Sequence, residues 1–550
     1  MSWIRDGAGL WREARAGGHL RCFDAAVPRV LHEQGRGAAM PTGHVFVIKG
    51  AIGKVVADAA VVSTDSVFKV EPHWHEVVAP ERTFVAGRHQ PEGWSETGWG
   101  RDAIGTTTWF LDVTATRTGD LDAFGRLGLL LANIAAANLT SRVKGRPLPL
   151  VVLPVIGTKG GGFSRERGSI VDQLLRACRE FVAKNPIDVA IVAKSPASYA
   201  ALQHTRRGQA ASYFGEVDLE AAGQIGESAR DGSLALFIGA GTSIPAGAPS
   251  WEGLIEVLAK EADLGEDVRA GFAGLSPLDQ AELLHSRLGP KLGETIKTQV
   301  EGLTPAMSHV LLANLNCQGA VTTNYDRLYE DAVASSDDFA ATVLPTEVPR
   351  AGGRWLLKMH GDVMDPESIV LTRGQFVGFT GISGPAGAVL QSLLLTKHLL
   401  VVGTSMKDDN FLRLIYEVAA YRKRTKSAAH TPPAAQEDPD RFGTILSLEE
   451  DPARRELNAP HFRWKSMPGA GIPESARQLE IFLDAVAMYA SGDNSWLLDP
   501  SFAFLLDEPE RRLAERATAL AKEIRRVRGD GAWGALAAGL DHFGANSSRD

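Results

Sequence analysis

The clearest pattern in the chain is an apolar run that leads into a glycine-rich turn and then into a helical repeat. Leu234–Ile238 (Leu-Ala-Leu-Phe-Ile) is typical of a strand buried on both faces of a parallel sheet. A glycine-rich turn follows at Gly239–Ser243, and apolar residues recur at helical spacing from Trp251 to Lys260. Strand, turn and helix are the parts of a dinucleotide-binding crossover, in which glycines let the backbone approach a pyrophosphate. The same turn also occurs as plain tight-turn geometry, so the motifs downstream decide between the two interpretations.

Three more predicted strands end in polar residues. They begin at Ala320, Leu356 and Leu399, and a further strand is predicted at Phe442–Leu448. The residues after the first three are Asn324, Tyr325 and Asp326, then His360 and Gly361, then Gly403, Thr404 and Ser405. Ligands bind at the carboxyl ends of strands in doubly wound sheets, so these residues predict a ligand site. From the residues alone, Asn324 can equally form a turn, Asp326 can cap a helix, and His360 can be structural.

The first half of the chain predicts a second α/β region. Strands are predicted at His44–Gly50, Val55–Val62, Thr106–Val113, Leu148–Ile156 and Asp188–Ala193, and helices at Leu121–Leu139 and Ser169–Lys184. Such alternation is typical of α/β folds. The fourth strand runs into a second glycine-rich junction, which consists of Gly157, Thr158, Lys159, Gly160, Gly161, Gly162 and Phe163.

This junction, which reads Leu-Pro-Val-Ile-Gly-Thr-Lys-Gly-Gly-Gly-Phe, resembles the phosphate loop of macrodomains, a family that binds ADP-ribose. Lys49–Ile52 and Ala57–Val62 resemble the N-terminal hairpin of that family, and the likeness covers His44–Arg207. The resemblance implies a macro-like domain in which Gly157–Phe163 contact an ADP-ribose-like ligand.

The sequence departs from the macrodomain pattern in two places. Ala51 stands where an acidic residue usually holds the adenine amine, and Ser63–Asp65 occupies the region of the catalytic asparagine. The resemblance therefore implies a ligand-binding domain rather than a hydrolase of ADP-ribosyl bonds. A ligand-free scaffold domain is the alternative.

The four strand-end motifs of the second half, in their order, resemble the sirtuin-like NAD-binding fold. The likeness is to the bacterial branch found in anti-phage defence effectors of the Thoeris type, and it covers Leu234–Tyr489. The chain lacks the four-cysteine zinc ribbon of deacylating sirtuins, because Cys22, Cys178 and Cys317 are its three cysteines and lie far apart. The resemblance therefore implies NAD hydrolysis rather than protein deacylation.

The resemblance also assigns roles to the motif residues. Backbone N–H groups of Gly239, Ala240, Gly241, Thr242 and Ser243 hold the pyrophosphate of NAD, while Gly403, Thr404 and Ser405 line the adenosine side. Asn324 orients the attacking water or the nicotinamide ribose, Asp326 fixes the carboxamide, and His360 accepts a proton from water or a ribose hydroxyl. No metal site is predicted, since His73 and His75 form a pair with no third ligand nearby.

These predictions divide the chain into five segments. They are a variable leader (1–43), a macro-like domain (44–207), a linker with the first helix of the next core (208–233), a sirtuin-like domain (234–490) and a C-terminal helical region (491–550). Within the fourth segment, residues 422–440 are predicted to be a surface loop. In the last, Leu513–Arg526 predicts a strong helix, which either packs on its own domain or joins copies into a homo-oligomer.

Composition narrows the class of protein. A chain of 550 residues is long enough for about three domains. The formal net charge of −8 gives no basic footprint for nucleic acid. No apolar run reaches the ~20 residues that span a bilayer. Scattered cysteines and a charged first segment without a signal-peptide pattern predict a cytoplasmic protein.

Together the two resemblances imply a two-module defence effector. The sirtuin-like domain hydrolyses NAD, and the macro-like domain senses an ADP-ribose-derived nucleotide made by a partner with a TIR domain. A non-catalytic nucleotide-binding regulator is one alternative. A protein deacylase or ADP-ribosyltransferase is another, although the absent zinc ribbon argues against deacylation.

Overall fold

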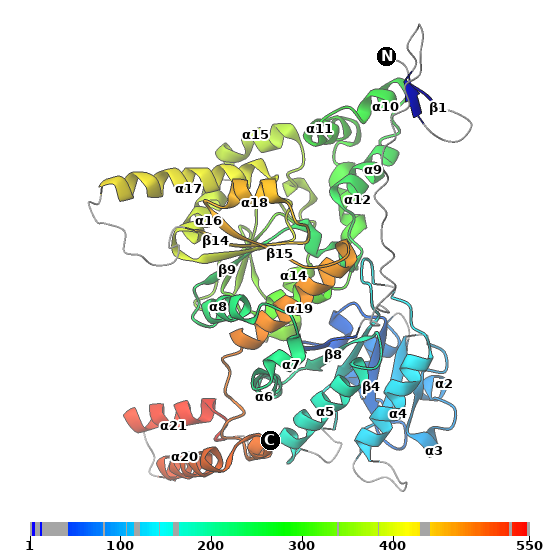
Figure 1. Cartoon of the computed structure of the whole chain (residues 1–550), viewed down its shortest axis with the longest axis vertical. Coiled ribbons are helices and arrows are strands. Elements are labelled where there is room, and N and C mark those ends of the chain that lie inside the picture. The colour runs from blue at the N-terminus through cyan, green and yellow to red at the C-terminus, as the bar shows by residue number, and fades with distance from the viewer. Residues whose placement is uncertain are drawn as a thin grey trace. The chain divides into compact units, whose positions relative to one another are not determined.

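The computed structural model describes most of the chain in two units, 1–41 and 42–550. The described residues are 3–5, 11–13, 42–80, 83–105, 107–114, 122–141, 143–157, 164–337, 340–382, 384–428, 441–526 and 531–546. In the first unit, β1 (Trp3–Arg5) pairs antiparallel with β2 (Trp11–Glu13). The second unit contains two separate sheets, both flanked by helices (Figure 1). The predicted α/β fold class is therefore confirmed.

The first sheet has six strands in the order β3-β8-β7-β4-β6-β5. All neighbouring pairs are parallel except β5 with β6. The strands are β3 (Val45–Lys49), β4 (Ala59–Thr64), β5 (Trp99–Arg101), β6 (Thr108–Asp112), β7 (Leu150–Pro154) and β8 (Asp188–Ala193). The helices are α1 (His75–Val78), α2 (Ala86–His89), α3 (Trp94–Thr97), α4 (Ala123–Ala136), α5 (Arg167–Val182) and α6 (Pro196–Arg207).

The hairpin expected between the first two strands of this sheet is absent, so that prediction was wrong. β3 pairs with β8, and β4 lies between β7 and β6, so two strands separate β3 from β4. The segment expected to start the second strand at Val55 is irregular, because its polar groups bond outside the sheet pattern. Val56 N–H donates to the carbonyl of Pro305 at 2.9 Å, and Asp58 Oδ2 accepts from Leu150 N at 2.7 Å.

The second sheet has seven parallel strands in the order β11-β12-β10-β9-β13-β14-β15. They are β9 (Leu234–Ile238), β10 (Gly319–Thr322), β11 (Thr342–Leu344), β12 (Trp355–Lys358), β13 (His398–Val402), β14 (Gly443–Ser447) and β15 (Phe462–Ser466). Leaving out β11 at the edge, this is the 3-2-1-4-5-6 order of doubly wound dinucleotide-binding folds. The order reverses between β9 and β13, which places the topological switch point at their carboxyl ends.

Helices cover both faces of this sheet because its strands are apolar on both sides (Figure 1). One face packs on α8 (Leu219–Arg230), α13 (Met307–Asn314), α14 (Leu328–Ser336) and α19 (Ile472–Ala490). The other packs on α16 (Gly384–Thr396) and α17 (Asp409–Ala428). The remaining helices are α7 (Ala210–Phe214), α9 (Trp251–Glu261), α10 (Glu266–Phe272), α11 (Pro277–Leu288), α12 (Lys291–Val300), α15 (Arg373–Ile382), α18 (Pro452–Asn458), α20 (Glu508–Arg526) and α21 (Ala532–His542).

Two details of this half differ from the sequence predictions. α17 continues to Ala428, so the first part of the predicted loop at 422–440 is helical, and 429–440 lie outside the described residues. β11 and β15 are short strands that were not predicted, since neither Thr342–Leu344 nor Phe462–Ser466 forms a long apolar run.

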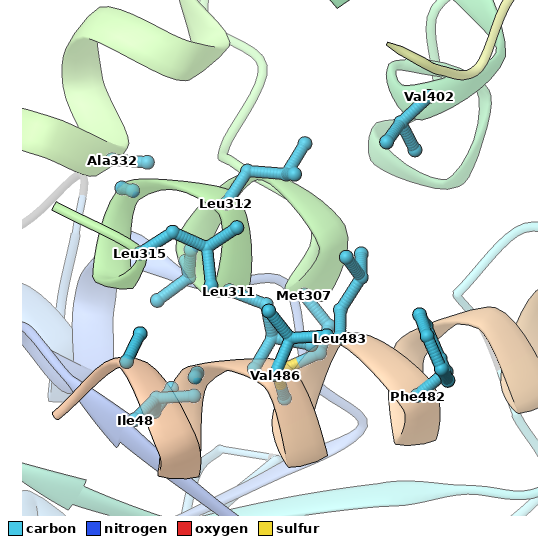
Figure 2. Packing of buried hydrophobic residues seen from close by; sticks show 14 of the residues in the cluster. Ile48, Met307, Leu311, Leu312, Leu315, Ala332, Val402, Phe482, Leu483 and Val486 are labelled. Carbon is cyan, nitrogen blue, oxygen red and sulfur yellow. The ribbon is translucent and has the colours of Figure 1, made fainter. Parts of the chain in front are cut away.

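One hydrophobic core contains residues of both sheets, and α19 lies in it. Leu483 and Val486 of α19 face α13, whose Met307 and Leu311 lie next to them (Figure 2). The same core includes buried residues of β3, β7 and β8 from the first sheet. Residues 208–233, expected to be a linker and one helix, form α7 and α8, and α8 packs along α19.

Buried charges also connect α19 to the first sheet. Asp484 Oδ2 lies 2.5 Å from Arg206 Nη2 and 2.8 Å from His44 Nε2. Arg477 and Arg146 both pair with Asp188, the first residue of β8, at 2.8 Å and 2.5 Å. Arg146 also pairs with Glu480 of α19. The three arginines balance the three acids, and burial lowers the pKa of His44, which keeps that ring neutral.

We predict that Asp484→Ala destabilises the protein by about 3–5 kcal/mol, because it leaves the Arg206 guanidinium buried without its partner. Glu417→Ala is the matched control, since the Arg413–Glu417 pair on α17 is largely exposed and contributes about 0–1 kcal/mol. Urea unfolding followed by circular dichroism measures both. Equal midpoints for the two variants would contradict the prediction.

Candidate active site

The four predicted motifs lie side by side because their strands end in the same row. Val402 of β13 pairs with Ile238 of β9, Ile238 with Thr322 of β10, and Thr322 with Lys358 of β12. Each is the last residue of its strand. The residues that follow, including Gly239, Asn324 and His360, therefore leave the sheet at one edge, at the switch point where doubly wound folds bind ligands.

The two glycine motifs touch each other across this edge. Gly241 N–H donates to the carbonyl of Gly403 at 2.8 Å, and Thr242 Oγ1 donates to the carbonyl of Gly239 at 2.8 Å. A Cβ on Gly239 would lie 2.5 Å from the Gly403 oxygen. Gly403 has a φ of +73°, and a Cβ there would lie 2.7 Å from the backbone nitrogen of Thr242. Neither position therefore accommodates a larger residue.

The turn after β9 differs from a simple strand-to-helix junction. Ala240–Thr242 and Ile244–Ala246 form short 3-10 turns, and α9 begins only at Trp251, capped by Ser250 Oγ. Within Gly239–Ser243, the exposed residues are Ala240 and Gly241. Any phosphate held here is therefore bound by the short turn itself rather than by the N-terminus of α9.

Asn324, Ser243 and Asp326 form a buried hydrogen-bonded group. Asn324 Nδ2 donates to the carbonyl of Gly239 at 3.2 Å and to Ser243 Oγ at 3.1 Å. Ser243 Oγ donates to Asp326 Oδ2 at 2.7 Å, while Asp326 Oδ1 accepts from Leu328 N–H at the start of α14 at 3.0 Å. The carbonyl of Gly239 can only accept, so it fixes which end of the Asn324 amide is nitrogen.

The oxygen at the other end of that amide is buried. Asn324 is 7% exposed, and among the residues that the structure describes none donates a hydrogen bond to its Oδ1. A buried acceptor of this kind is costly unless a donor reaches it. A water molecule or a sugar hydroxyl supplies such a donor.

His309 completes the group and was not singled out in the sequence. Its Nδ1 accepts from Ala306 N–H at 3.2 Å, so the ring proton is on Nε2, which lies 3.3 Å from Ser243 Oγ. Burial lowers the pKa of His309 to about 4. The ring is therefore neutral at physiological pH. A histidine inside the apolar helix α13 was the only signal in the sequence.

His360 lies at the end of the neighbouring strand, and the structure buries it. The side chain is 5% exposed, its Nε2 lies 3.4 Å from Asp408 Oδ2, and its ring meets Phe376 edge-on with centroids 5.0 Å apart. Burial lowers the pKa of His360, opposed by Asp408. A neutral imidazole beside a carboxylate can accept a proton. Asp408 also caps α17 by accepting from Phe411 N–H.

The motif after β13 continues from Gly403 into a partly exposed loop. Thr404 Oγ1 accepts from Met406 N–H at 3.2 Å, and the carbonyl of exposed Ser405 accepts from Arg454 Nη1 at 2.9 Å. Thr404 and Ser405 follow β13 and so lie at the same edge of the sheet as the other motifs. Their contact with a ligand stays a prediction.

The glycine-rich junction of the first sheet is largely outside the described residues. Gly157 is described and has a φ of +70°, whereas Thr158, Lys159, Gly160, Gly161, Gly162 and Phe163 are not. The role of this loop therefore stays a prediction. His75 bonds to the carbonyl of Val70 and stacks on Phe84, and within the described ranges no group of three His, Cys, Asp or Glu residues could hold a metal.

A cavity of about 1160 Å³ lies close to this edge of the second sheet. Its lining includes Arg327, Glu330 and Asp362 near the β10 and β12 loops, and Lys49 and Lys194 at the carboxyl ends of β3 and β8. None of the four motifs lines it. The cavity therefore borders both sheets but is separate from the predicted NAD site.

A match to a known protein family falls within the part of the chain that forms the second sheet. Residues 318–463 match the family model of the SIR2-like domain. The NAD(+) hydrolase ThsA of Acinetobacter baumannii is 28% identical over 34% of this chain, and that of Bacillus cereus is 29% identical over 35%. The defense-associated sirtuin 2 of Bacillus subtilis is 25% identical over 39%. The chain spans 39%, 41% and 22% of the length of these relatives.

Two solved structures are also similar. A chain from a study of the mechanism and regulation of Sir2 enzymes aligns with 48% of this chain and 96% of its own length, at 15% identity and a TM-score of 0.27. A mutant macrodomain of Oceanobacillus iheyensis with ADPR aligns with 32% of this chain and 97% of its own length, at 16% identity and a TM-score of 0.22. In the described part of the chain, no helix is both long and apolar enough to cross a bilayer.

We predict that Gly403→Ala destabilises the protein by more than about 1 kcal/mol, because it strains a left-handed residue and drives a Cβ into Thr242. Gly128→Ala makes the same chemical change on α4, where a Cβ meets nothing within 4 Å, and is expected to stabilise by about 0.5–1 kcal/mol. Thermal unfolding distinguishes the two. An unchanged unfolding temperature for Gly403→Ala would contradict the close approach of Gly403 to Thr242.

We predict a pH signature for His309. Its pKa in the fold, about 4, is below the ordinary value of 6.5, so the unfolded chain binds the proton more tightly. The stability that His309 contributes is present above pH 6.5 and is lost as pH falls toward 4. His309→Gln should therefore show a shallower loss over that window in urea titrations. Parallel curves would show that His309 does not titrate as described.

The site combines a glycine-rich turn, an asparagine whose side-chain oxygen has no donor among the described residues, and a neutral histidine at one edge of a doubly wound sheet. Within this sheet, residues 318–463 carry the match to the SIR2-like domain.

Proposed function

We propose that this protein is an NAD⁺ glycohydrolase that depletes cellular NAD⁺ in anti-phage defence. The observation that carries the proposal is the row of strand ends, which gathers Gly239–Ser243, Asn324, His360 and Gly403 at the switch point. Relatives named as NAD(+) hydrolases and as a defense-associated sirtuin support it, as does the matched SIR2-like domain.

The reaction breaks the bond between C1′ of ribose and the nicotinamide nitrogen. Nicotinamide leaves with the bonding electrons, and positive charge develops on an oxocarbenium-like ribose. Water attacks C1′ and gives up one proton, so the products are ADP-ribose, nicotinamide and a proton. Because nicotinamide is a good leaving group, the protein must mainly position the ribose and the water.

The described residues fit these tasks. Asn324 Oδ1 accepts a hydrogen bond from the water or a ribose hydroxyl, and the bonds to its Nδ2 keep it pointed there. His360 accepts the proton, which requires the neutral ring that burial favours. Both oxygens of Asp326 already accept hydrogen bonds, so its main task is to hold Ser243 and the start of α14, with lone pairs left for the carboxamide.

We further propose that the first sheet senses an ADP-ribose-derived nucleotide, supplied by a partner with a TIR domain, and releases the activity. The predicted phosphate loop Gly157–Phe163 supports this role, and some restraint is required because an unregulated NADase would kill its host. We also propose that the protein is a cytoplasmic homo-oligomer. Exposed Leu513 and Leu520 on α20 offer an apolar stripe for assembly.

We predict that His360→Ala lowers NAD⁺ hydrolysis by about 10²–10⁴-fold, the usual worth of a positioned acid–base group. Asn324→Ala should lower it by about 10²-fold, because the water or the ribose is no longer held in place. Purified protein is assayed for nicotinamide release with and without cyclic and linear ADP-ribose derivatives. His285→Ala, an exposed histidine on α11, is the control and should retain activity.

The outcomes separate the candidate functions. Loss of NAD⁺ that depends on His360 and rises with one nucleotide supports both modules. Full activity that no nucleotide alters contradicts the sensor. No loss under any condition leaves a non-catalytic nucleotide-binding regulator, and turnover of acylated peptides would instead indicate a deacylase.

A further inference from the structure

One buried lysine contacts both loops that carry the predicted catalytic residues. Lys358 is the last residue of β12, and its side chain is 1% exposed. Its Nζ lies 2.6 Å from the carbonyl oxygen of Asp326 and 3.2 Å from that of Tyr325. The same Nζ lies 2.8 Å from Glu330 Oε1 and 3.1 Å from Asp362 Oδ2.

These four oxygens come from three segments. Tyr325 and Asp326 form the turn after β10, Glu330 lies on α14, and Asp362 lies on the loop after β12. Asn324 immediately precedes this turn, and His360 is two residues after Lys358. An ammonium group has three protons and no preferred plane, so it can bind oxygens that converge from several directions.

A second contact joins the same two loops. Val363 N–H donates to the carbonyl of Tyr325 at 3.1 Å, and Val363 is buried. The Lys358 ammonium and this hydrogen bond therefore share one carbonyl. The relative position of the β10 turn and the β12 loop depends on both.

We propose that Lys358 is a positioning residue of the NAD site, which ties the turn after β10 to the loop after β12 and so fixes Asn324 and His360 relative to each other. This proposal rests on the proposed hydrolysis of NAD⁺. Lys358 touches neither substrate nor reacting atoms in this assignment; it acts through the two loops.

A purely structural role is the competing explanation, because removing one partner of a buried ion pair destabilises many proteins. Glu330 makes the two roles separable. Burial raises the pKa of Glu330 to about 7, so this acid loses little when it is replaced by a neutral amide. The double variant Lys358→Met with Glu330→Gln removes the ammonium without leaving that carboxylate buried and unpaired.

The experiment compares wild type, Lys358→Met, Glu330→Gln and the double variant by thermal unfolding and NAD⁺ hydrolysis. We expect Glu330→Gln to keep kcat within about threefold, since the ammonium still holds both carbonyls and Asp362. The double variant should regain most of the unfolding temperature lost in Lys358→Met, yet its kcat should stay about 10–100-fold low with a smaller change in KM, as for other residues that orient a site. Recovery of kcat together with stability would overturn the proposal.

Hydrogen exchange gives a readout that does not depend on activity. In the double variant, exchange of the backbone amide of Val363 and of the amides of 323–328 should rise together by at least tenfold. Unchanged exchange in either loop would overturn the positioning role. If wild type does not hydrolyse NAD⁺ but exchange rises as expected, the proposed function fails while the connection between the loops holds.

Discussion

The site depends on the registry of four parallel strands. β13, β9, β10 and β12 end on one row, from Val402 through Ile238 and Thr322 to Lys358. Registry of this kind is set by the backbone ladder and by side chains that pack differently on the two buried faces, so a slip of one residue would move every core residue to the opposite face of the sheet. The row brings together residues that are 165 positions apart in the chain, Gly239 and Thr404 among them, without a loop that reaches across the sheet.

The close approach of two glycine turns adds a second constraint. Gly239 and Gly403 lie too near each other for any side chain, which holds the turn after β9 against the turn after β13. That contact positions the carbonyl of Gly239, and this carbonyl in turn orients the Asn324 amide. The backbone carbonyl at the end of β9 therefore determines which atom of the Asn324 amide, after β10, is left to accept a hydrogen bond. Ser243 connects this hydrogen-bonded group to His309 of α13, and burial keeps the imidazole of His309 neutral.

Much of the site could be predicted from sequence because its motifs follow apolar runs. The strand at Leu234–Ile238 and the polar residues after Thr322 and Lys358 are local patterns, and the structure shows them at adjacent strand ends. His309 and Lys358 could not be found in this way, since their roles arise from contacts with Ser243 and Asp326, which lie 66 and 32 positions away in the chain. The prediction of a hairpin between β3 and β4 failed for a related reason. Two apolar strands that are close in sequence have the same pattern whether they pair with each other or are separated in the sheet by strands that come later in the chain.

A structure of the protein with a non-hydrolysable carbocyclic analogue of NAD⁺ tests the central claim most directly. The account predicts its pyrophosphate on the backbone of Gly239–Ser243 and its nicotinamide ribose between Asn324 Oδ1 and His360. An analogue found in the cavity lined by Lys49 and Arg327, with the glycine turn empty, would contradict the assignment of the site.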